Sequence, residues 1–282
     1  TVENFGLKIG LNGAFGKLID KWSPLFCPPA GMSITINGQL LLAMLCEMVT
    51  ERKVGKVVMV NTDGIEVIVN RSKIEEYHAI CKEWEDITGL TLETDYYKSL
   101  FIEHVNSYLA ITPEGYSYTK GYFEVEKDYH KDHSMTIVPL MANRCLERGI
   151  SSKKRIESML AAAWRMHAKN PKLLHRFLIG KRVSRRSPSE FESRYIVPDT
   201  QELIKIPLVD TIRYLVVQEG GEYLFKVYDN GKESKLTSRK QVIIMNKIQG
   251  DYLHLKPDYN FYSSEVLKVI SPILNAQQSL FE

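Results

Sequence analysis

Two short apolar runs, residues 57–60 and 65–69, are rich in β-branched side chains and flank the polar stretch Asn61-Thr62-Asp63-Gly64. This pattern predicts a β-hairpin with Asp63 at or beside its turn. A carboxylate held on a rigid hairpin is well placed to bind a divalent cation. Asp-Gly is also good turn chemistry by itself, because glycine tolerates a positive φ. The stretch alone leaves both interpretations open.

The remaining periodicities predict helices over 1–18, 37–51 and 72–88, and strands over 90–111 and 117–125. Residues 131–192 read as mostly helical, and 203–256 alternate like strands with turns at 220–221 and 229–231. A last helix is expected over about 263–280, interrupted or kinked near Pro272. Together these elements predict an α+β fold. We expect an antiparallel sheet with helices on one of its faces. A helical part and then a small β-rich C-terminal segment should follow this sheet.

Composition limits the class of protein. The 282 residues suffice for two domains, and 44% hydrophobic residues is ordinary for a globular chain. The run 40–44 is too short to span a membrane, and residues 1–4 lack the basic start of a signal peptide. The four cysteines have no CxxC spacing, so neither a zinc site nor a disulfide framework is expected. We therefore expect a cytoplasmic protein with no membrane partner.

The net charge is only +3, but basic residues are concentrated between 151 and 194. They are Lys153, Lys154, Arg155, Arg165, Lys169, Lys172, Arg176, Lys181, Arg182, Arg185 and Arg186. Such a basic belt suits a phosphate backbone. A solvated helical face would show the same charge run.

The first predicted helix places Lys8, Asn12 and Phe15 along one face, at i, i+4 and i+7. A cation, an amide and an aromatic ring in one line suit a triphosphate, a sugar and a base. The helix also contains Gly10, Gly13 and Gly16, which would let a bulky group approach its backbone. The alternative to a nucleotide-binding helix is an ordinary amphipathic helix with a loosely packed, glycine-rich side.

Three of these stretches resemble motifs of the family B DNA polymerases, in the family's order. Lys8-Ile-Gly-Leu-Asn12-Gly-Ala-Phe15-Gly16 resembles the Lys-x-x-x-Asn-Ser-x-Tyr-Gly motif of the fingers helix. The segment 33–42, with Gly38-Gln39, resembles the palm helix, and the stretch 61–64 resembles the palm motif Asp-Thr-Asp-Ser.

Later segments extend the resemblance over nearly the whole chain. Residues 91–102, 105–110 and 118–124 are similar to palm strands that follow the catalytic hairpin and contact the primer. Residues 127–142, 212–221 and 258–262 resemble segments of phage-type polymerases. The resemblance implies the end of the fingers helix at 1–20, the palm at 21–130, and the thumb with a C-terminal segment at 131–282.

The resemblance implies DNA-templated DNA synthesis, a nucleotidyl transfer from a dNTP to a primer 3′-hydroxyl with two Mg²⁺ ions. Asp63 would be the catalytic carboxylate and a metal ligand, with Asn61 as a weaker metal ligand. Lys8, Asn12 and Phe15 would bind the nucleotide. Contacts to primer–template DNA would come from Tyr108, Lys120, Gly121, His130 and Lys131.

This chain differs from the family pattern at positions that matter for polymerase activity. The family's other essential Asp lies on a strand upstream of the fingers, for which this chain has no match. Since the chain also begins at Thr1, we expect a C-terminal portion that needs an N-terminal polymerase half as its partner and is inactive alone. Asn61 stands where the family usually has Asp, and Asn106-Ser107-Tyr108 where it often has Lys-x-Tyr. A DNA-binding module without activity, or an unrelated α+β protein, would be the alternatives.

Overall fold

The computed structural model describes residues 2–127, 131–182, 193–196, 203–206, 211–227, 233–235, 241–248 and 250–279. Its contacts divide the chain into two compact units, Thr1–Tyr96 and Tyr97–Glu282. This division falls inside the stretch 21–130 expected to be the palm. Each unit is described here by itself.

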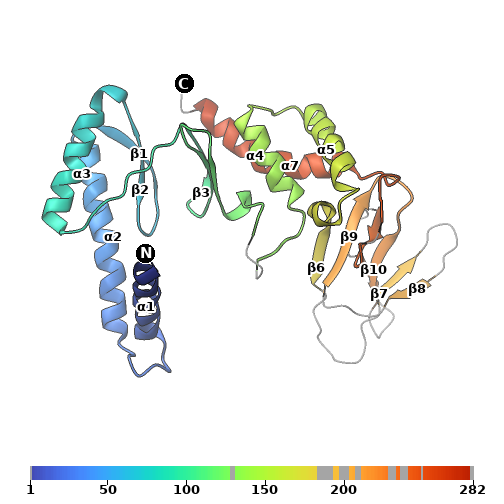
Figure 1. Cartoon of the computed structure of the whole chain (residues 1–282), viewed down its shortest axis with the longest axis horizontal. Coiled ribbons are helices and arrows are strands. Elements are labelled where there is room, and N and C mark those ends of the chain that lie inside the picture. The colour runs from blue at the N-terminus through green and yellow to red at the C-terminus, as the bar shows by residue number, and fades with distance from the viewer. Residues whose placement is uncertain are drawn as a thin grey trace. The chain divides into compact units, whose positions relative to one another are not determined.

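Unit 1 is an antiparallel hairpin with two helices on one side (Figure 1). Its elements are α1 (Val2–Ile19), α2 (Pro28–Glu51), β1 (Gly55–Val60), β2 (Ile65–Val69), η1 (Arg71–Lys73) and α3 (Ile74–Thr88). The buried side chains of Leu45, Val49, Val54, Ile80 and Trp84 form its core. Trp84 Nε1 donates a 2.8 Å hydrogen bond to the Leu41 carbonyl and so ties α3 to α2.

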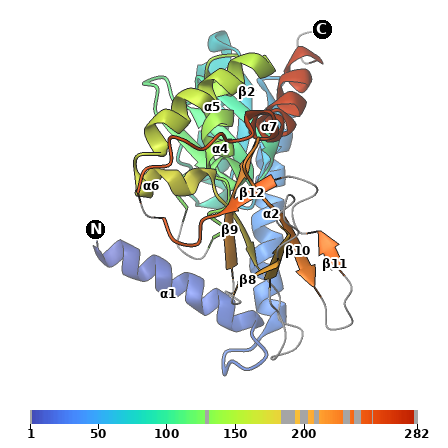
Figure 2. The same cartoon turned by 90° about the vertical axis from the view of Figure 1, so that its right-hand side faces the viewer.

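Helix α1 meets α2 near its own C-terminal end, and the two helices separate toward Val2 (Figure 2). The close approach depends on Gly31, because a Cβ there would lie 2.6 Å from Cγ2 of Ile19. The Cys27 amide donates a 2.9 Å hydrogen bond to the Leu18 carbonyl, which brings together the two ends of the loop between α1 and α2. Large apolar side chains of both helices are exposed, among them Leu11 and Leu40.

Helix α2 begins at Pro28, well before the position expected from its periodicity. At 24 residues and a mean hydropathy of 1.4 over 18 of them, it is the one helix among the described residues that is long and apolar enough to cross a membrane. A single helix of this kind is weak support for a membrane location, because core helices can have the same length and composition. In this structure α2 contacts β1, α1 and α3.

Unit 2 begins with the antiparallel sheet β3-β4-β5, formed by Ser99–His104, Ser107–Ile111 and Ser117–Lys120. The turn η2 (Gly121–Phe123) follows. Its helices are α4 (Ile137–Glu147), α5 (Lys153–His167), the short α6 (Pro171–Leu174) with the turn η3 (His175–Phe177), and α7 (Tyr259–Ser279). Helices α4 and α5 contact α7, and the inner face of the sheet adds Phe101 and Leu109 to this core.

Two further antiparallel sheets complete unit 2. One has the order β12-β9-β6, from Gln241–Ile244, Thr211–Val217 and Ile179–Arg182. The other has the order β11-β10-β7-β8, from Glu233–Lys235, Tyr223–Val227, Ser193–Ile196 and Leu203–Ile206. These sheets, the helices and the hairpin confirm the α+β class.

Local structure differs from the expectations in several places. The described part of the range 131–192 is mostly helical, as expected, but it also contains strand β6, because Ile179 pairs with Tyr214 of β9 and this tertiary pairing overrides local preference. Residues 90–98 have almost no regular structure, and the strand expected over 117–125 ends at Lys120. Helix α7 begins at Tyr259, earlier than expected; it continues through Pro272 without interruption and changes direction along its length (Figure 2). The expected turn at 229–231 lies outside the described residues.

Candidate functional site

The turn between β1 and β2 is organised by the side chain of Asn61. Its Oδ1 accepts hydrogen bonds from the amides of Asp63 at 2.9 Å and Gly64 at 2.8 Å. The Asn61 amide in turn donates to the Gly64 carbonyl at 3.0 Å. Such an Asx-type turn holds the chain direction at the tip. The carboxylate of Asp63 is thereby presented to solvent on a fixed backbone.

This geometry gives Asn61 and Asp63 different roles. An amide oxygen has two lone pairs, and both backbone donors already engage Oδ1 of Asn61. Asn61 would have to release a turn hydrogen bond to bind a metal, so the structure favours a turn role over the expected metal-ligand role. Asp63 fits as a ligand to one cation. The described residues contain no group of three His, Cys, Asp or Glu side chains that could hold a metal. A pair of Mg²⁺ ions would need further oxygen ligands from elsewhere.

The three residues expected to bind a nucleotide share helix α1. Lys8 and Asn12 are exposed, and Phe15 is half-buried. A Cβ at Gly10, Gly13 or Gly16 would meet nothing within 4 Å, so this helix has room for a close partner. Helix α1 and strand β1 both contact α2. A pocket of about 390 Å³ at the α2–β1 contact is lined in part by Gln39, Glu47, Val60 and Asn61.

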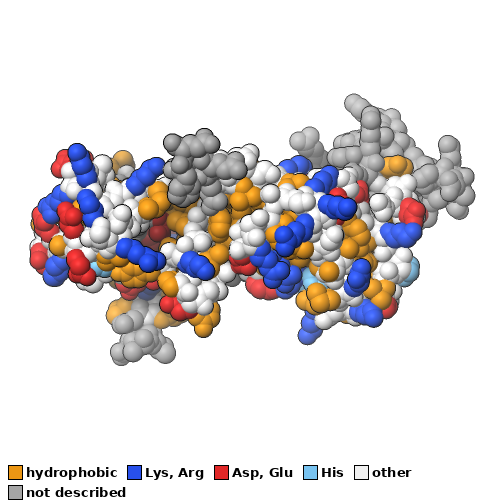
Figure 3. Space-filling model, turned by 90° about the horizontal axis from the view of Figure 1, so that it is seen from above, with side chains coloured by type: hydrophobic (Ala, Val, Ile, Leu, Met, Phe, Trp, Pro, Cys, Tyr) orange, Lys and Arg blue, Asp and Glu red, His pale blue; other side chains and the backbone are white. Residues whose placement is uncertain are grey.

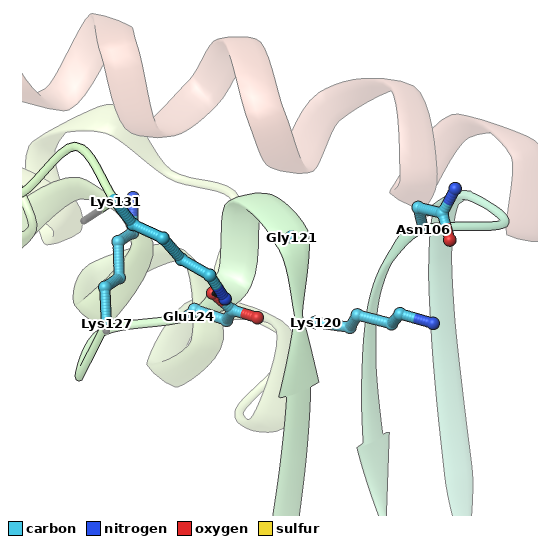
Figure 4. A pocket seen from close by; sticks show the side chains of 6 residues that line it. All are labelled: Asn106, Lys120, Gly121, Glu124, Lys127 and Lys131. Atoms are coloured by element: carbon cyan, nitrogen blue, oxygen red, sulfur yellow. Dashed lines mark hydrogen bonds and ion pairs between the residues drawn. The ribbon is translucent and has the colours of Figure 1, made fainter. Parts of the chain in front are cut away.

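Unit 2 contains a second pocket, of about 350 Å³, whose lining includes three lysines (Figure 4). We call it the lysine pocket; it is lined by Asn106, Lys120, Gly121, Glu124, Lys127 and Lys131. Lys131 Nζ lies 2.8 Å from Oε2 of Glu124. Figure 4 shows Glu124 and Lys131 meeting on one side with Lys127 beside them, while Lys120 and Asn106 lie on the other. Three ammonium groups against one carboxylate leave an excess of positive charge, which suits an anionic ligand.

The backbone turn at Gly121 builds this pocket. Gly121 has φ +65°, and a Cβ there would lie 2.2 Å from the Asn106 carbonyl oxygen. The buried hydroxyl of Ser107 accepts from the Tyr122 amide at 3.1 Å and donates to Glu103 at 2.6 Å. These contacts hold the turn against the β3–β4 connection, so the positions of Lys120 and Glu124 are fixed by the main chain.

The turn is also tied to helix α4. Nδ2 of Asn143 donates a buried 3.0 Å hydrogen bond to the Phe123 carbonyl. Burial, with Glu265 and Glu103 nearby, raises the pKa of Tyr122 to about 12, so its hydroxyl stays neutral at physiological pH. The pocket therefore stands on a rigid element packed on the core of unit 2.

Tyr108 lies directly opposite Lys120 in the β4–β5 register. Lys120 Nζ lies 5.9 Å from the centroid of the Tyr108 ring, within reach of a cation–π interaction. The structure thus brings together Tyr108, Lys120, Gly121 and Lys131, four residues assigned to DNA separately from the sequence. His130 lies outside the described residues. Asn106, Glu124 and Lys127 were missed, because nothing in their local pattern marks them as pocket residues.

Basic side chains continue beyond the lysine pocket across α4 and α5. Arg176 Nη2 lies 2.5 Å from Oε1 of Glu126, close in sequence to the pocket. Exposed members of this surface are Arg144, Arg148, Lys153, Lys154, Arg155, Arg165, Lys169 and Lys172. Figure 3 shows lysine and arginine side chains gathered over this part of unit 2. Arg185 and Arg186 of the expected belt lie outside the described residues.

In comparisons with known proteins, no family model matches the chain, and no curated protein matches it.

Proposed function

We propose that this chain is the C-terminal portion of a phage-type family B DNA-directed DNA polymerase and takes part in DNA-templated DNA synthesis. One observation carries the proposal: residues assigned to primer–template DNA from separate motifs line or adjoin one lysine pocket. A pocket with excess positive charge on a rigid turn suits the phosphates of a duplex. We place the protein in the cytoplasm, where DNA and dNTPs are available.

Each group has a role in this proposal. Lys8 and Asn12 of α1 bind the triphosphate of a dNTP, and Phe15 stacks under the incoming base pair. Tyr108, Lys120 and Lys131 position the primer strand. Asp63, exposed on its fixed turn, contributes one carboxylate to the metal site. When bound there, Mg²⁺ would activate the primer 3′-hydroxyl and stabilise the charge of the leaving pyrophosphate.

A second polypeptide part is required by this proposal. Asp63 supplies one carboxylate, and the family's other essential Asp belongs to a strand upstream of the fingers, for which this sequence has no match. We infer that the other catalytic carboxylate comes from an N-terminal polymerase half. The chain alone should bind DNA without extending a primer.

A primer-extension assay with labelled primer–template DNA, dNTPs and Mg²⁺ tests the proposal. The chain is assayed alone and after addition of a separately expressed N-terminal half of a family B polymerase. Extension only in the mixture is expected, and Asp63→Ala should abolish it with DNA binding nearly intact. Lys8→Ala should raise the dNTP concentration needed for half-maximal extension. Near-normal incorporation by Asp63→Ala would remove that carboxylate from the mechanism.

A DNA-binding module without activity is the second candidate. It is favoured by the engagement of Asn61 in the turn, where the family usually has an acidic ligand. The two candidates differ in the complemented assay. Salt-dependent DNA binding with no extension in any mixture would support the binding module.

A further inference from the structure

The lysine pocket contains a carboxylate that a simple anion site would not need. Glu124 is 19% exposed at its side chain and lies 2.8 Å from Lys131 Nζ, while Lys120 and Lys127 line the same pocket. A fixed carboxylate repels an entering phosphate and competes with it for the ammonium group of Lys131. Because the carboxylate is mostly buried, solvent and salt screen this effect less than at an open surface.

We propose that Glu124 limits the affinity of the lysine pocket for a DNA phosphate by competing for Lys131. A phosphate that enters must displace the Glu124 carboxylate from Lys131, and the carboxylate recovers Lys131 when the phosphate leaves. This inference rests on the proposed function, because it takes the phosphate backbone of DNA as the ligand of the pocket.

The position of Glu124 supports competition at a fixed place. Its amide donates to the Gly121 carbonyl at 3.3 Å, so it belongs to the turn that also sets the position of Lys120. In Figure 4 the Glu124–Lys131 pair occupies one side of the pocket and Lys120 the other. The Lys120 side chain runs away from the pair toward Asn106, so a phosphate that binds Lys131 meets the carboxylate of Glu124 as its direct competitor.

Such competition has a use in a protein that follows a duplex. After each added nucleotide, every phosphate contact has to break and reform one residue along the strand. A pocket with three uncompensated ammonium groups would hold each phosphate longer. The carboxylate lowers the net charge of the pocket from +3 to +2, counted over its lining residues, and so favours release.

Fluorescence anisotropy of the full chain with a labelled primer–template duplex tests the proposal. Glu124→Gln keeps the shape of the side chain and removes its charge. We expect it to bind the duplex several-fold more tightly with a slower dissociation rate. The slope of the logarithm of the association constant against the logarithm of the salt concentration should steepen by up to about 0.9, because the pocket then offers the DNA one more uncompensated positive charge.

Glu219→Gln is the matched control. Glu219 pairs with Lys256 as Glu124 pairs with Lys131, but neither Glu219 nor Lys256 lines the pocket or belongs to the basic belt. The same change of net charge there should alter affinity and salt slope much less. Equal effects of the two variants would overturn the proposal, because they would reduce it to overall charge. Affinity of Glu124→Gln equal to or weaker than that of the unaltered chain would overturn it too.

A second pair of variants keeps the proposal testable where Glu124→Gln fails to fold, which thermal unfolding detects. Lys131→Gln leaves the carboxylate of Glu124 facing the phosphate, so it should weaken binding more than Lys127→Gln does. Equal losses would contradict the competition. If the unaltered chain shows no salt-dependent DNA binding at all, the proposed function fails. If it binds and the variants of Glu124 and Lys131 behave like their controls, the competition alone fails.

Discussion

Lys120 and Tyr108 face each other across β4 and β5, with the Lys120 ammonium 5.9 Å from the centroid of the Tyr108 ring. The ammonium group lies over the ring, within the range of a cation–π interaction, which favours this direction of the Lys120 side chain. Lys120 is also the last residue of β5, immediately before the Gly121 turn. The ammonium group is therefore directed by a strand, a ring and a turn together.

We predict that Lys120→Gln weakens binding of primer–template DNA and lowers the salt slope by about 0.9, because one phosphate contact is lost. Lys120→Arg should keep most of the affinity for DNA and most of the salt slope, because arginine carries the same charge. Titrations by anisotropy at several salt concentrations measure the two quantities. Lys268→Gln is the control, because Lys268 pairs with Glu265 on α7 and does not line the pocket. The assignment of Lys120 would be wrong if both glutamine variants had the same slope.

A second prediction concerns the Gly121 turn. In Gly121→Ala the new Cβ would clash with the Asn106 carbonyl at 2.2 Å, and φ would stay positive at +65°. We expect a loss of about 3 kcal/mol or more in the free energy of unfolding of unit 2, together with weaker DNA binding. Urea unfolding of a chain in which Trp22 and Trp84 are replaced by Phe, so that Trp164 alone fluoresces, measures the loss of stability of unit 2.

Gly115→Ala is the control that separates the cost of a positive φ from the cost of the steric clash with Asn106. Gly115 also has a positive φ, +89°, but a Cβ there would meet nothing within 4 Å. Gly115→Ala should lower the free energy of unfolding by only about 1 kcal/mol, the strain expected for a non-glycine residue in the left-handed region. Similar losses in the two variants would show that the close approach to Asn106 has little effect.

The sequence predicted those elements whose pattern is local. The β-branched runs around 61–64 gave the hairpin, and the apolar stripe that includes Ile80 and Trp84 gave α3, both of which the structure contains. The Asp-Gly pair placed Asp63 at an exposed turn. In each case, side chains a few residues apart determine the conformation.

Other features could not be read in this way because distant residues determine them. Strand β6 exists through its pairing with β9, whose paired residues lie 29 to 35 positions later in the chain. The lysine pocket assembles from the β3–β4 connection, the Gly121 turn and the segment at Lys131. Glu124 lies among ordinary surface acids in the sequence, and only the fold places it among three lysines. The two hydrogen bonds that occupy Asn61 likewise depend on the exact turn geometry.

A third prediction tests the role of Asn61. In Asn61→Ala the amides of Asp63 and Gly64 lose their side-chain acceptor, at a cost of about 1 kcal/mol to the local turn. Hydrogen exchange at these two amides should accelerate. Asn61→Asp keeps an acceptor oxygen and should keep their protection, and it adds a second carboxylate beside Asp63. Unchanged exchange in the alanine variant would contradict the turn role.

The last prediction concerns the acid stability of unit 2 and depends on His167. This side chain is 5% exposed, its ring centroid lies 5.7 Å from that of Phe177, and its Nδ1 has no hydrogen-bond partner among the residues that the structure describes. Burial, with a smaller contribution from Arg176 and Arg144, lowers the pKa of His167 from 6.5 to about 4. Because the unfolded chain takes up this proton first, stability is complete above pH 6.5 and falls as the pH drops toward 4. The difference of 2.5 pH units corresponds to about 3 kcal/mol. Urea unfolding between pH 7.5 and 4, followed by the fluorescence of Trp164 with Trp22 and Trp84 replaced by Phe, should show this loss, and His167→Leu should reduce it. The exposed His254 provides the control, and an equal pH slope in His167→Leu and His254→Leu would show that His167 is not the group that titrates.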